Sequence, residues 1–262
     1  MKFNDLYKII NEQESILIPR RASKERQEKY KIAIARQIDH VKNGGVGDLN
    51  LEDTNITELP DDMPIIRGSL NISSLNISKL PSNLKLVEGD LFMSLTKITH
   101  LPDGLTVNGT LEINETPITK LPENLTVKKD FWTRNSKIQE LPESLKVGGD
   151  LVLDYSAIKT LPKSMSKIYG YCNLAMSKLE YLPDNLTVMS NLYLNGSNIK
   201  QLPKNLTVKG ELNIGETDIE TLPPDLKVGV YLGVKGSTLG FKYSNKQIKR
   251  MCPGVKEIHR QW

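Results

Sequence analysis

Apolar residues recur along this chain in a short, regular pattern. Pairs of apolar residues two positions apart, such as Leu111 and Ile113, are followed five residues later by a third apolar position, here Ile118. A spacing of two is the period of a β-strand, so both members of a pair face the same side of the strand. A Leu-Pro dipeptide closes each unit, and its proline favours extended or tight-turn backbone over a long helix.

The pattern is an internal repeat with a nearly fixed period. Leu-Pro recurs with spacings of 20 or 21 residues, at Leu59, Leu80, Leu101, Leu121, Leu141, Leu161, Leu182, Leu202 and Leu222. With a first unit that lacks the leading proline, residues 46–241 hold ten units. One unit cannot bury its own leucines, whereas stacked units form a continuous core. The sequence predicts a repeat solenoid with a parallel β-ribbon on one face and short extended or turn segments on the other.

Two recurrent small residues have predicted roles in each unit. The glycine just before the strand, such as Gly109 or Gly149, suits a turn that needs a positive φ. A hydroxyl residue follows the strand and is expected to bond turn backbone; the series is Thr54, Thr96, Thr116, Ser136, Ser156, Ser177, Ser197, Thr217 and Ser237. Leu75 interrupts this series once.

Atypical segments flank the repeats, as expected of an open solenoid that must cover its terminal units. Residues 1–45 predict a helical N-terminal cap: a short first helix, then a second from about Ser23 to Lys42 that Gly44 and Gly45 stop. Residues 242–262 predict a helical C-terminal cap, in which Ser244 starts a short helix that runs through Met251. Tyr243 or Trp262 is expected to cover the last coil.

Composition narrows the function classes. The formal net charge is +4, too small to indicate nucleic acid, and no apolar run approaches membrane-spanning length. The three histidines are scattered, so we predict no metal and no cofactor. Cys172 replaces a strand leucine and is expected in the core, which leaves Cys252 as the one candidate nucleophile. We therefore predict a non-enzymatic protein without nucleic-acid or membrane partners.

One unit departs from the monotony: residues 128–136 read KKDFWTRNS where others carry small or neutral residues. Strand alternation turns Phe131 and Thr133 inward, and Trp132 and Arg134 outward. Outward positions of nearby units add further aromatic residues, and the predicted partner-binding patch is Phe92, Trp132, Arg134, Val152, Tyr155, Tyr171 and Tyr193. Exposed Trp, Tyr and Arg are typical of protein-binding surfaces, although aromatic side chains also favour strands in general.

An acidic row precedes the strands, at Asp48, Asp90, Asp130, Asp150 and Glu211. These carboxylates would repel phosphate, which argues against nucleic acid. They could hold a basic partner or simply keep the ribbon soluble, and the sequence leaves both interpretations open.

The repeat L-x-L-x-x-T-x-I, with its Leu-Pro closure, resembles a leucine-rich repeat, and the short unit is similar to the repeats of secreted bacterial effector proteins. A hydroxyl residue stands where that family has Asn. The resemblance implies a protein-binding solenoid.

The order of the segments, from leader and basic helix through Leu-Pro repeats to the C-terminal cap, resembles leucine-rich repeat proteins of tailed bacteriophages. Residues 1–12, ending Ile10-Asn11-Glu12, are similar to head-targeting leaders of phage internal proteins. No single activity follows from the layout, but proteins with such leaders enter the cell with the DNA and blunt host defences. Together with the outward aromatic face, this leads us to expect an anti-defence inhibitor in the host bacterial cytoplasm that occupies a host protein such as a toxin enzyme. The alternatives are an internal virion protein packaged in the head, and a carbohydrate-binding module. The sequence does not decide whether the chain is a monomer or self-associates.

Overall fold

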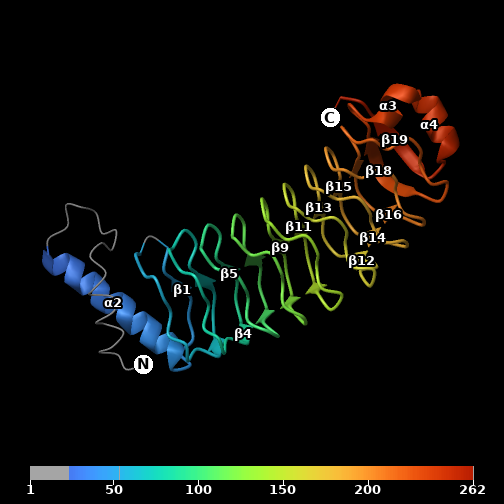
Figure 1. The fold of residues 1–262 in the computed structure, drawn as a ribbon. Helices are drawn as coiled ribbons and strands as arrows, with labels where there is room; N and C mark the ends of the chain where they lie inside the picture. Colours follow the sequence, from blue (N-terminus) through green and yellow to red (C-terminus); the bar gives the residue numbers. More distant parts are fainter. Residues whose placement is uncertain (1–23, 53, 262) are drawn as a thin grey trace.

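The computed structural model describes residues 24–52 and 54–261 and confirms the predicted leucine-rich repeat solenoid. Figure 1 shows an elongated stack of coils, with helix α2 at the N-terminal end and helices α3 and α4 at the C-terminal end. The predicted first helix, the leader 1–12 and Trp262 lie outside the described residues. Among the described residues, no helix has the length and apolar character needed to cross a membrane.

One face of the solenoid is the predicted parallel ribbon, here called the front ribbon. Neighbouring strands pair in register, so that Phe131 lies between Leu111 and Leu151. Each front amide donates to a carbonyl of the next coil, as from Leu111 N to Asp130 O at 2.9 Å. The strands are β1 (Leu49–Asn50), β3 (Leu70–Asn71), β5 (Leu91–Phe92), β7 (Leu111–Glu112), β9 (Phe131–Trp132), β11 (Leu151–Val152), β13 (Cys172–Asn173), β15 (Leu192–Tyr193) and β17 (Leu212–Asn213).

The returning side of each coil contains a second two-residue strand, and these strands form the back ribbon. The sequence predicted extended backbone there, but not a second ladder. Its amides donate to carbonyls of the preceding coil, as from Thr126 N to Leu105 O at 3.1 Å, whereas the amides of the front ribbon donate to the next coil. The strands are β2 (Ile65–Ile66), β4 (Leu86–Val87), β6 (Thr106–Val107), β8 (Thr126–Val127), β10 (Lys146–Val147), β12 (Lys167–Ile168), β14 (Thr187–Val188) and β16 (Thr207–Val208).

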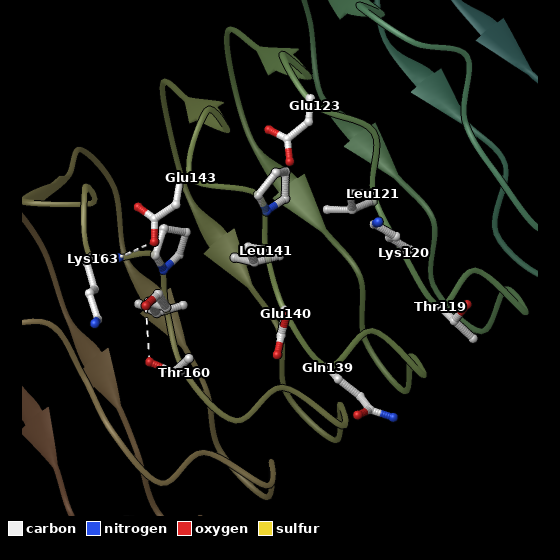
Figure 2. Close-up of a pocket in the computed structure, with 13 residues that line it drawn as sticks. Thr119, Lys120, Leu121, Glu123, Gln139, Glu140, Leu141, Glu143, Thr160 and Lys163 are labelled. Atoms are coloured by element: carbon white, nitrogen blue, oxygen red, sulfur yellow. Dashed lines mark hydrogen bonds between the residues drawn. The ribbon is translucent and has the colours of Figure 1, made fainter.

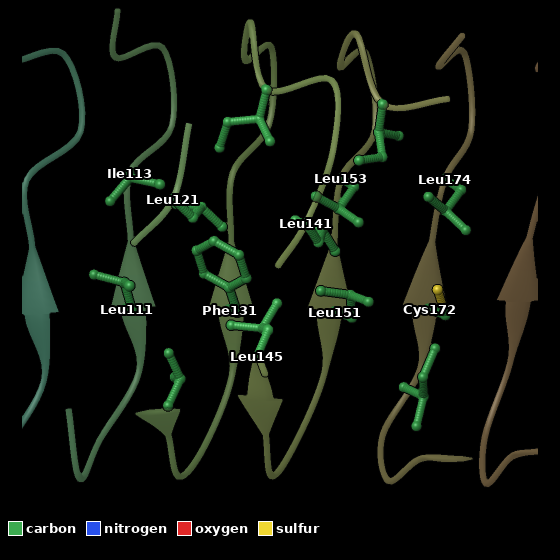
Figure 3. Close-up of a cluster of buried hydrophobic side chains, with 14 of the residues drawn as sticks. Leu111, Ile113, Leu121, Phe131, Leu141, Leu145, Leu151, Leu153, Cys172 and Leu174 are labelled. Atoms are coloured by element: carbon green, nitrogen blue, oxygen red, sulfur yellow. The ribbon is translucent and has the colours of Figure 1, made fainter. Parts of the chain in front are cut away.

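The core fills the space between the two ribbons with the repeated leucines and isoleucines. Figure 3 shows Leu111, Phe131, Leu151 and Cys172 on consecutive front strands, with their side chains in one row. All four are fully buried, which confirms the inward placement of Phe131 and Cys172. Thr133 is also fully buried, as predicted, and its hydroxyl has no hydrogen-bond partner among the described residues.

The hydroxyl series has the predicted role in most coils. The side chain donates to the carbonyl three residues earlier at 2.6–2.9 Å, in Thr54, Thr96, Thr116, Ser177, Ser197, Thr217 and Ser237. Ser136 differs, because its buried hydroxyl has no partner within the described chain.

The predicted reason for the glycine before each strand is wrong in all coils but the first. Of these glycines only Gly47 has a positive φ, of 149°. A Cβ on Gly109 would lie 2.1 Å from Asp90 Oδ1 and 2.6 Å from Gly89 O of the preceding coil. Close approach of the preceding coil therefore favours glycine at position 109, whereas other coils accommodate Lys129 and Ser190 at the equivalent place.

Both ends of the stack are covered. Helix α2 (Lys24–Lys42) confirms the predicted second helix and buries Ile34, Ala35, Ile38 and Val41 against the first coils. Strand β18 (Lys227–Gly233) joins the two ribbons by pairing with both β16 and β17. Beyond it lie α3 (Thr238–Lys242), α4 (Asn245–Met251) and β19 (Val255–His259), which pairs with β18. Ser244 caps α4, as predicted, whereas α3 and β19 were not predicted. Tyr243 is partly buried against the core.

Candidate partner-binding face

The outward side chains of the central coils lie in a row fixed by the strand register. Trp132 lies between Glu112 and Val152, and Tyr193 follows two strands beyond Val152. Because parallel strands are about 4.8 Å apart, the row from Trp132 to Tyr193 spans roughly 14 Å. Phe92 lies two strands from Trp132 in the other direction, beyond Glu112. The structure therefore brings the aromatic residues onto one face, with Phe92 at its margin.

Arg134 is held by a buried carboxylate of the next coil. Its Nε lies 2.9 Å from Asp154 Oδ2 and 3.1 Å from Asp154 Oδ1. The Arg134 side chain is 57% exposed, whereas the Asp154 side chain is 3% exposed. The main-chain amide of Arg134 also donates to Asn114 Oδ1 at 2.7 Å. The buried Asp154 carboxylate thus fixes the orientation of the Arg134 guanidinium, which remains exposed to solvent.

Tyr155 lies beside this pair on the turn that follows β11. Its φ is 57°, and 55% of the residue is exposed. Arg134 and Tyr155 line a small open recess of about 340 Å³, together with Asn114, Glu115 and Asn135. The left-handed backbone is a strained conformation for a bulky residue, so this exposed tyrosine is held where stability alone favours glycine or asparagine.

Two further tyrosines form an aromatic pair on neighbouring coils. The rings of Tyr171 and Tyr193 meet edge to face, with centroids 6.4 Å apart. The Tyr193 hydroxyl accepts from Asn191 Nδ2 at 2.8 Å. We call Trp132, Arg134, Tyr155, Tyr171 and Tyr193 the central front face.

Val152 does not belong to the exposed patch, which corrects the predicted set. Only 4% of its surface is exposed, although its position alternates outward. Its short side chain lies beside the larger Trp132 in the ladder. Val152 therefore supports the aromatic face from below rather than presenting a contact surface.

Trp132 itself is half buried. Its indole N–H is buried and has no hydrogen-bond partner among the described residues. Leaving such a donor unsatisfied costs free energy, on the order of 1–3 kcal/mol. The position is therefore not optimised for the stability of this chain alone.

The acidic row has a structural role that neither sequence interpretation anticipated. Each of its aspartates accepts a hydrogen bond at 2.7–2.8 Å from a backbone amide of the next coil: Asp48 from Ser69, Asp90 from Thr110, Asp130 from Asp150, and Asp150 from Tyr171. These carboxylates link consecutive coils.

The electrostatic surroundings of the central front face are acidic. Burial raises the pKa of Asp150, and the nearby Asp130 raises it further, against the opposing effect of the Tyr171 amide. Burial, followed by Asp150, raises the pKa of the Tyr171 hydroxyl. The Tyr171 hydroxyl therefore stays a protonated donor at neutral pH.

Sequence reasoning missed the turn residues next to the strands. Leu95 and Met176 occupy the same left-handed turn position as Tyr155, with φ of 60° and 55°, and are 55% and 46% exposed. The signal that could have found them is the recurrence of large apolar residues at one turn position of the repeat.

The candidate nucleophile is not accessible. Cys252 is fully buried, its Sγ lies 3.3 Å from Leu226 O, and burial raises the pKa of its thiol. Cys172 is also buried, which again raises its thiol pKa. Among the described residues, no group of three or more His, Cys, Asp or Glu side chains could hold a metal ion.

A larger recess, of about 710 Å³, lies along the Leu-Pro edge of three successive coils. Figure 2 shows its lining: Glu123 and Glu143 occupy matching places in neighbouring coils, and Leu121 and Leu141 do the same. The Glu143 carboxylate already accepts hydrogen bonds from Lys163 N at 3.0 Å and from Ser164 N at 2.9 Å. The recess repeats with the coils and gathers no distinctive chemistry.

The class defined by this geometry is a leucine-rich repeat solenoid. No protein-family model matches the sequence, and no curated protein matches it. Among solved structures it is similar to the leucine-rich effector YopM from Yersinia pestis, with 19% identity and a TM-score of 0.48 over 90% of this chain and 83% of that one. It is also similar to YopM from Yersinia enterocolitica, with 18% identity and a TM-score of 0.45 over 100% of this chain and 64% of that one. A Shigella effector leucine-rich repeat domain is 20% identical, with a TM-score of 0.45 over 84% of this chain and 87% of that one.

Proposed function

We propose that this chain is a non-enzymatic binding scaffold that holds a protein partner on its central front face. The observation that carries the proposal is the fixed Arg134, which the buried Asp154 orients beside the exposed Tyr155. Arginine, tryptophan and tyrosine contribute most to binding energy at protein interfaces. A side chain already held in place loses less entropy on binding, so the arrangement is suited to recognition.

We further propose that the partner is a bacterial host protein, such as a defence factor or toxin enzyme, which the solenoid blocks by steric occupancy. What supports this partner is the similarity of residues 1–12 to the leaders of phage internal proteins that enter the cell and blunt host defences, within a layout that resembles phage leucine-rich repeat proteins. The same layout leaves an internal virion protein as the second candidate. The carbohydrate alternative is weaker, because Asp154 and one oxygen of Asp130 already have protein partners.

An affinity capture from bacterial lysate tests the proposal. The baits are wild type, the double variant Trp132→Ala/Arg134→Ala, and the control Tyr181→Ala, which removes a 67% exposed tyrosine outside both ribbons. We expect a protein that wild type and the control retain in stoichiometric amount and that the double variant loses. A protein retained equally by all three baits, or none in any, argues against this face and directs the search to purified particles and glycans.

A further inference from the structure

The back ribbon breaks once within the described chain, between β10 and β12. Strand β10 pairs with β8, and β12 pairs with β14, but no pairing joins β10 to β12. On the front, the same two coils stay joined through Leu151 and Cys172. The coils also stay joined on either side of the break, where Gly170 N donates to Gly149 O at 3.1 Å and Ser164 Oγ donates to Glu143 O at 2.7 Å, so only the short stretch between these bonds is unpaired.

The break follows a change in coil length. The unit from Leu161 to Leu182 spans 21 residues and the preceding unit spans 20, and the extra residue lies in the segment 165–168 that enters β12. Length alone does not open the ribbon: the unit holding β4 also spans 21 residues, and β4 pairs on both sides.

The break leaves complementary backbone groups unpaired. The carbonyls of Leu145 and Val147, and the amides of Lys167 and Tyr169, have no hydrogen-bond partner among the described residues. The equivalent groups between β8 and β10 are bonded at 3.1 Å and 2.9 Å. One edge thus offers two acceptors and the facing edge two donors, as an added parallel strand requires.

The space between these edges is open and apolar at its base. It forms a groove of about 680 Å³, here called the back-ribbon gap. Leu145 is 8% exposed, whereas its equivalents Leu125 and Leu186 are fully buried. Val147 and Met165 are likewise only partly buried, so the gap uncovers part of the core.

The rim of the gap is basic. Lys128, Lys146 and Lys167 line it, and none forms an ion pair among the described residues. The ammonium of Lys167 lies 4.6 Å from the ring centre of the exposed Tyr169. Glu143 also lines the gap, but its carboxylate is bonded to the amides of Lys163 and Ser164. The chemistry that complements this rim is acidic.

We propose that the back-ribbon gap accepts an extended acidic peptide segment of a partner protein as an inserted parallel strand. The segment donates amides to Leu145 and Val147 and accepts from Lys167 and Tyr169. Seating it between both edges needs about twice the 4.8 Å strand spacing, so the bond from Gly170 N to Gly149 O and the bonds of Glu143 to the next coil must open on binding, while the front pairing of Leu151 with Cys172 serves as the hinge. Strand alternation then sets its pattern: apolar residues face the core beside Val147, and acidic residues face the lysines.

The probe is a fluorescein-labelled peptide, Glu-Val-Glu-Val-Glu with blocked ends, titrated with the full chain and followed by anisotropy and by hydrogen exchange. We expect saturable binding with slowed exchange in residues 165–170. Deletion of Ser166, which restores the length of the preceding coil, closes the gap and abolishes binding. Lys146→Glu/Lys167→Glu weakens binding about tenfold or more.

Matched controls separate strand insertion from general attraction. Lys227→Glu removes a lysine at the equivalent place on an intact part of the ribbon and leaves binding unchanged. Trp132→Ala also leaves it unchanged, so this test does not depend on the central front face. Three results overturn the proposal: no saturable binding, binding that survives deletion of Ser166, or protection of residues 165–170 by self-association without peptide.

Discussion

Arg134 and Asp154 form a salt bridge across one coil of the solenoid, with the guanidinium Nε 2.9 Å from one carboxylate oxygen and 3.1 Å from the other. The carboxylate is buried and the arginine is more than half exposed. Asp154 therefore fixes the orientation of the exposed Arg134 side chain. Because the carboxylate is buried, the same pair also links the candidate binding face to the stability of the fold.

Arg134→Ala leaves the buried Asp154 charge without its partner. We expect the free energy of unfolding to fall by about 1–2 kcal/mol, less than for a fully buried pair because water screens the exposed guanidinium. Urea denaturation measures this change. Adding Asp154→Asn to the variant removes the unpaired charge and should recover most of the loss; no recovery would show that the salt bridge is not the cause.

Thr133→Val removes the buried hydroxyl that has no partner among the described residues. Valine has nearly the same shape, so we expect the free energy of unfolding to rise by about 1 kcal/mol, with an unchanged urea m-value. Thr116→Val is the matched control, because that hydroxyl donates to Ile113 O at 2.9 Å. Thr116→Val should therefore lower the free energy of unfolding. If Thr133→Val and Thr116→Val changed this free energy in the same direction, the Thr133 hydroxyl would not be the unsatisfied group that we infer.

Gly109→Ala tests whether close approach of the coils, rather than backbone conformation, selects glycine before the strand. The added methyl group meets Asp90 and backbone atoms of the preceding coil, and we expect a loss of roughly 2 kcal/mol in thermal or urea unfolding. At Gly233 the nearest atom to such a methyl group is Asn213 Oδ1, at 3.3 Å, so Gly233→Ala should be nearly neutral. Equal losses at both positions would refute the steric explanation.

Stability should decline in alkaline solution. Burial and Glu211 raise the pKa of Tyr231 to about 12, and burial raises the pKa of the Cys172 thiol. For a raised pKa the stabilisation is fully present below the unfolded-state pKa, which is about 8.5 for Cys and 10 for Tyr, and is lost as pH rises through the folded-state pKa. Unfolding free energies measured from pH 8 to roughly pH 11 should fall, with a shallower slope for Cys172→Val. A flat profile for wild type would contradict the prediction.

Much of the fold could be predicted from the sequence because each coil repeats the same local rules. Two-residue alternation places the core leucines, the hydroxyl series bonds the turns, and Ser244 starts α4. The bonds between coils are harder to predict, since they depend on how closely neighbouring units approach. The sequence shows Asp130 as an outward carboxylate, but only the stacking shows that it accepts from the amide of Asp150.

The candidate site was predicted in outline for the same reason. Alternation correctly directs Trp132 and Arg134 outward, but it cannot show that Val152 is buried beside a larger neighbour. Coil length is equally ambiguous. The extra residue before β12 coincides with the break in the back ribbon, whereas the one before β4 does not. Pairing between coils, not unit length, decides where the ribbon opens.

The affinity of the captured partner for wild type and for Trp132→Ala tests the central claim most directly. Calorimetry should show a one-to-one complex that Trp132→Ala weakens by about 30-fold, corresponding to about 2 kcal/mol, while circular dichroism shows that the variant remains folded. Tyr181→Ala should bind like wild type. Equal affinities for wild type and Trp132→Ala would contradict the claim that the central front face holds the partner.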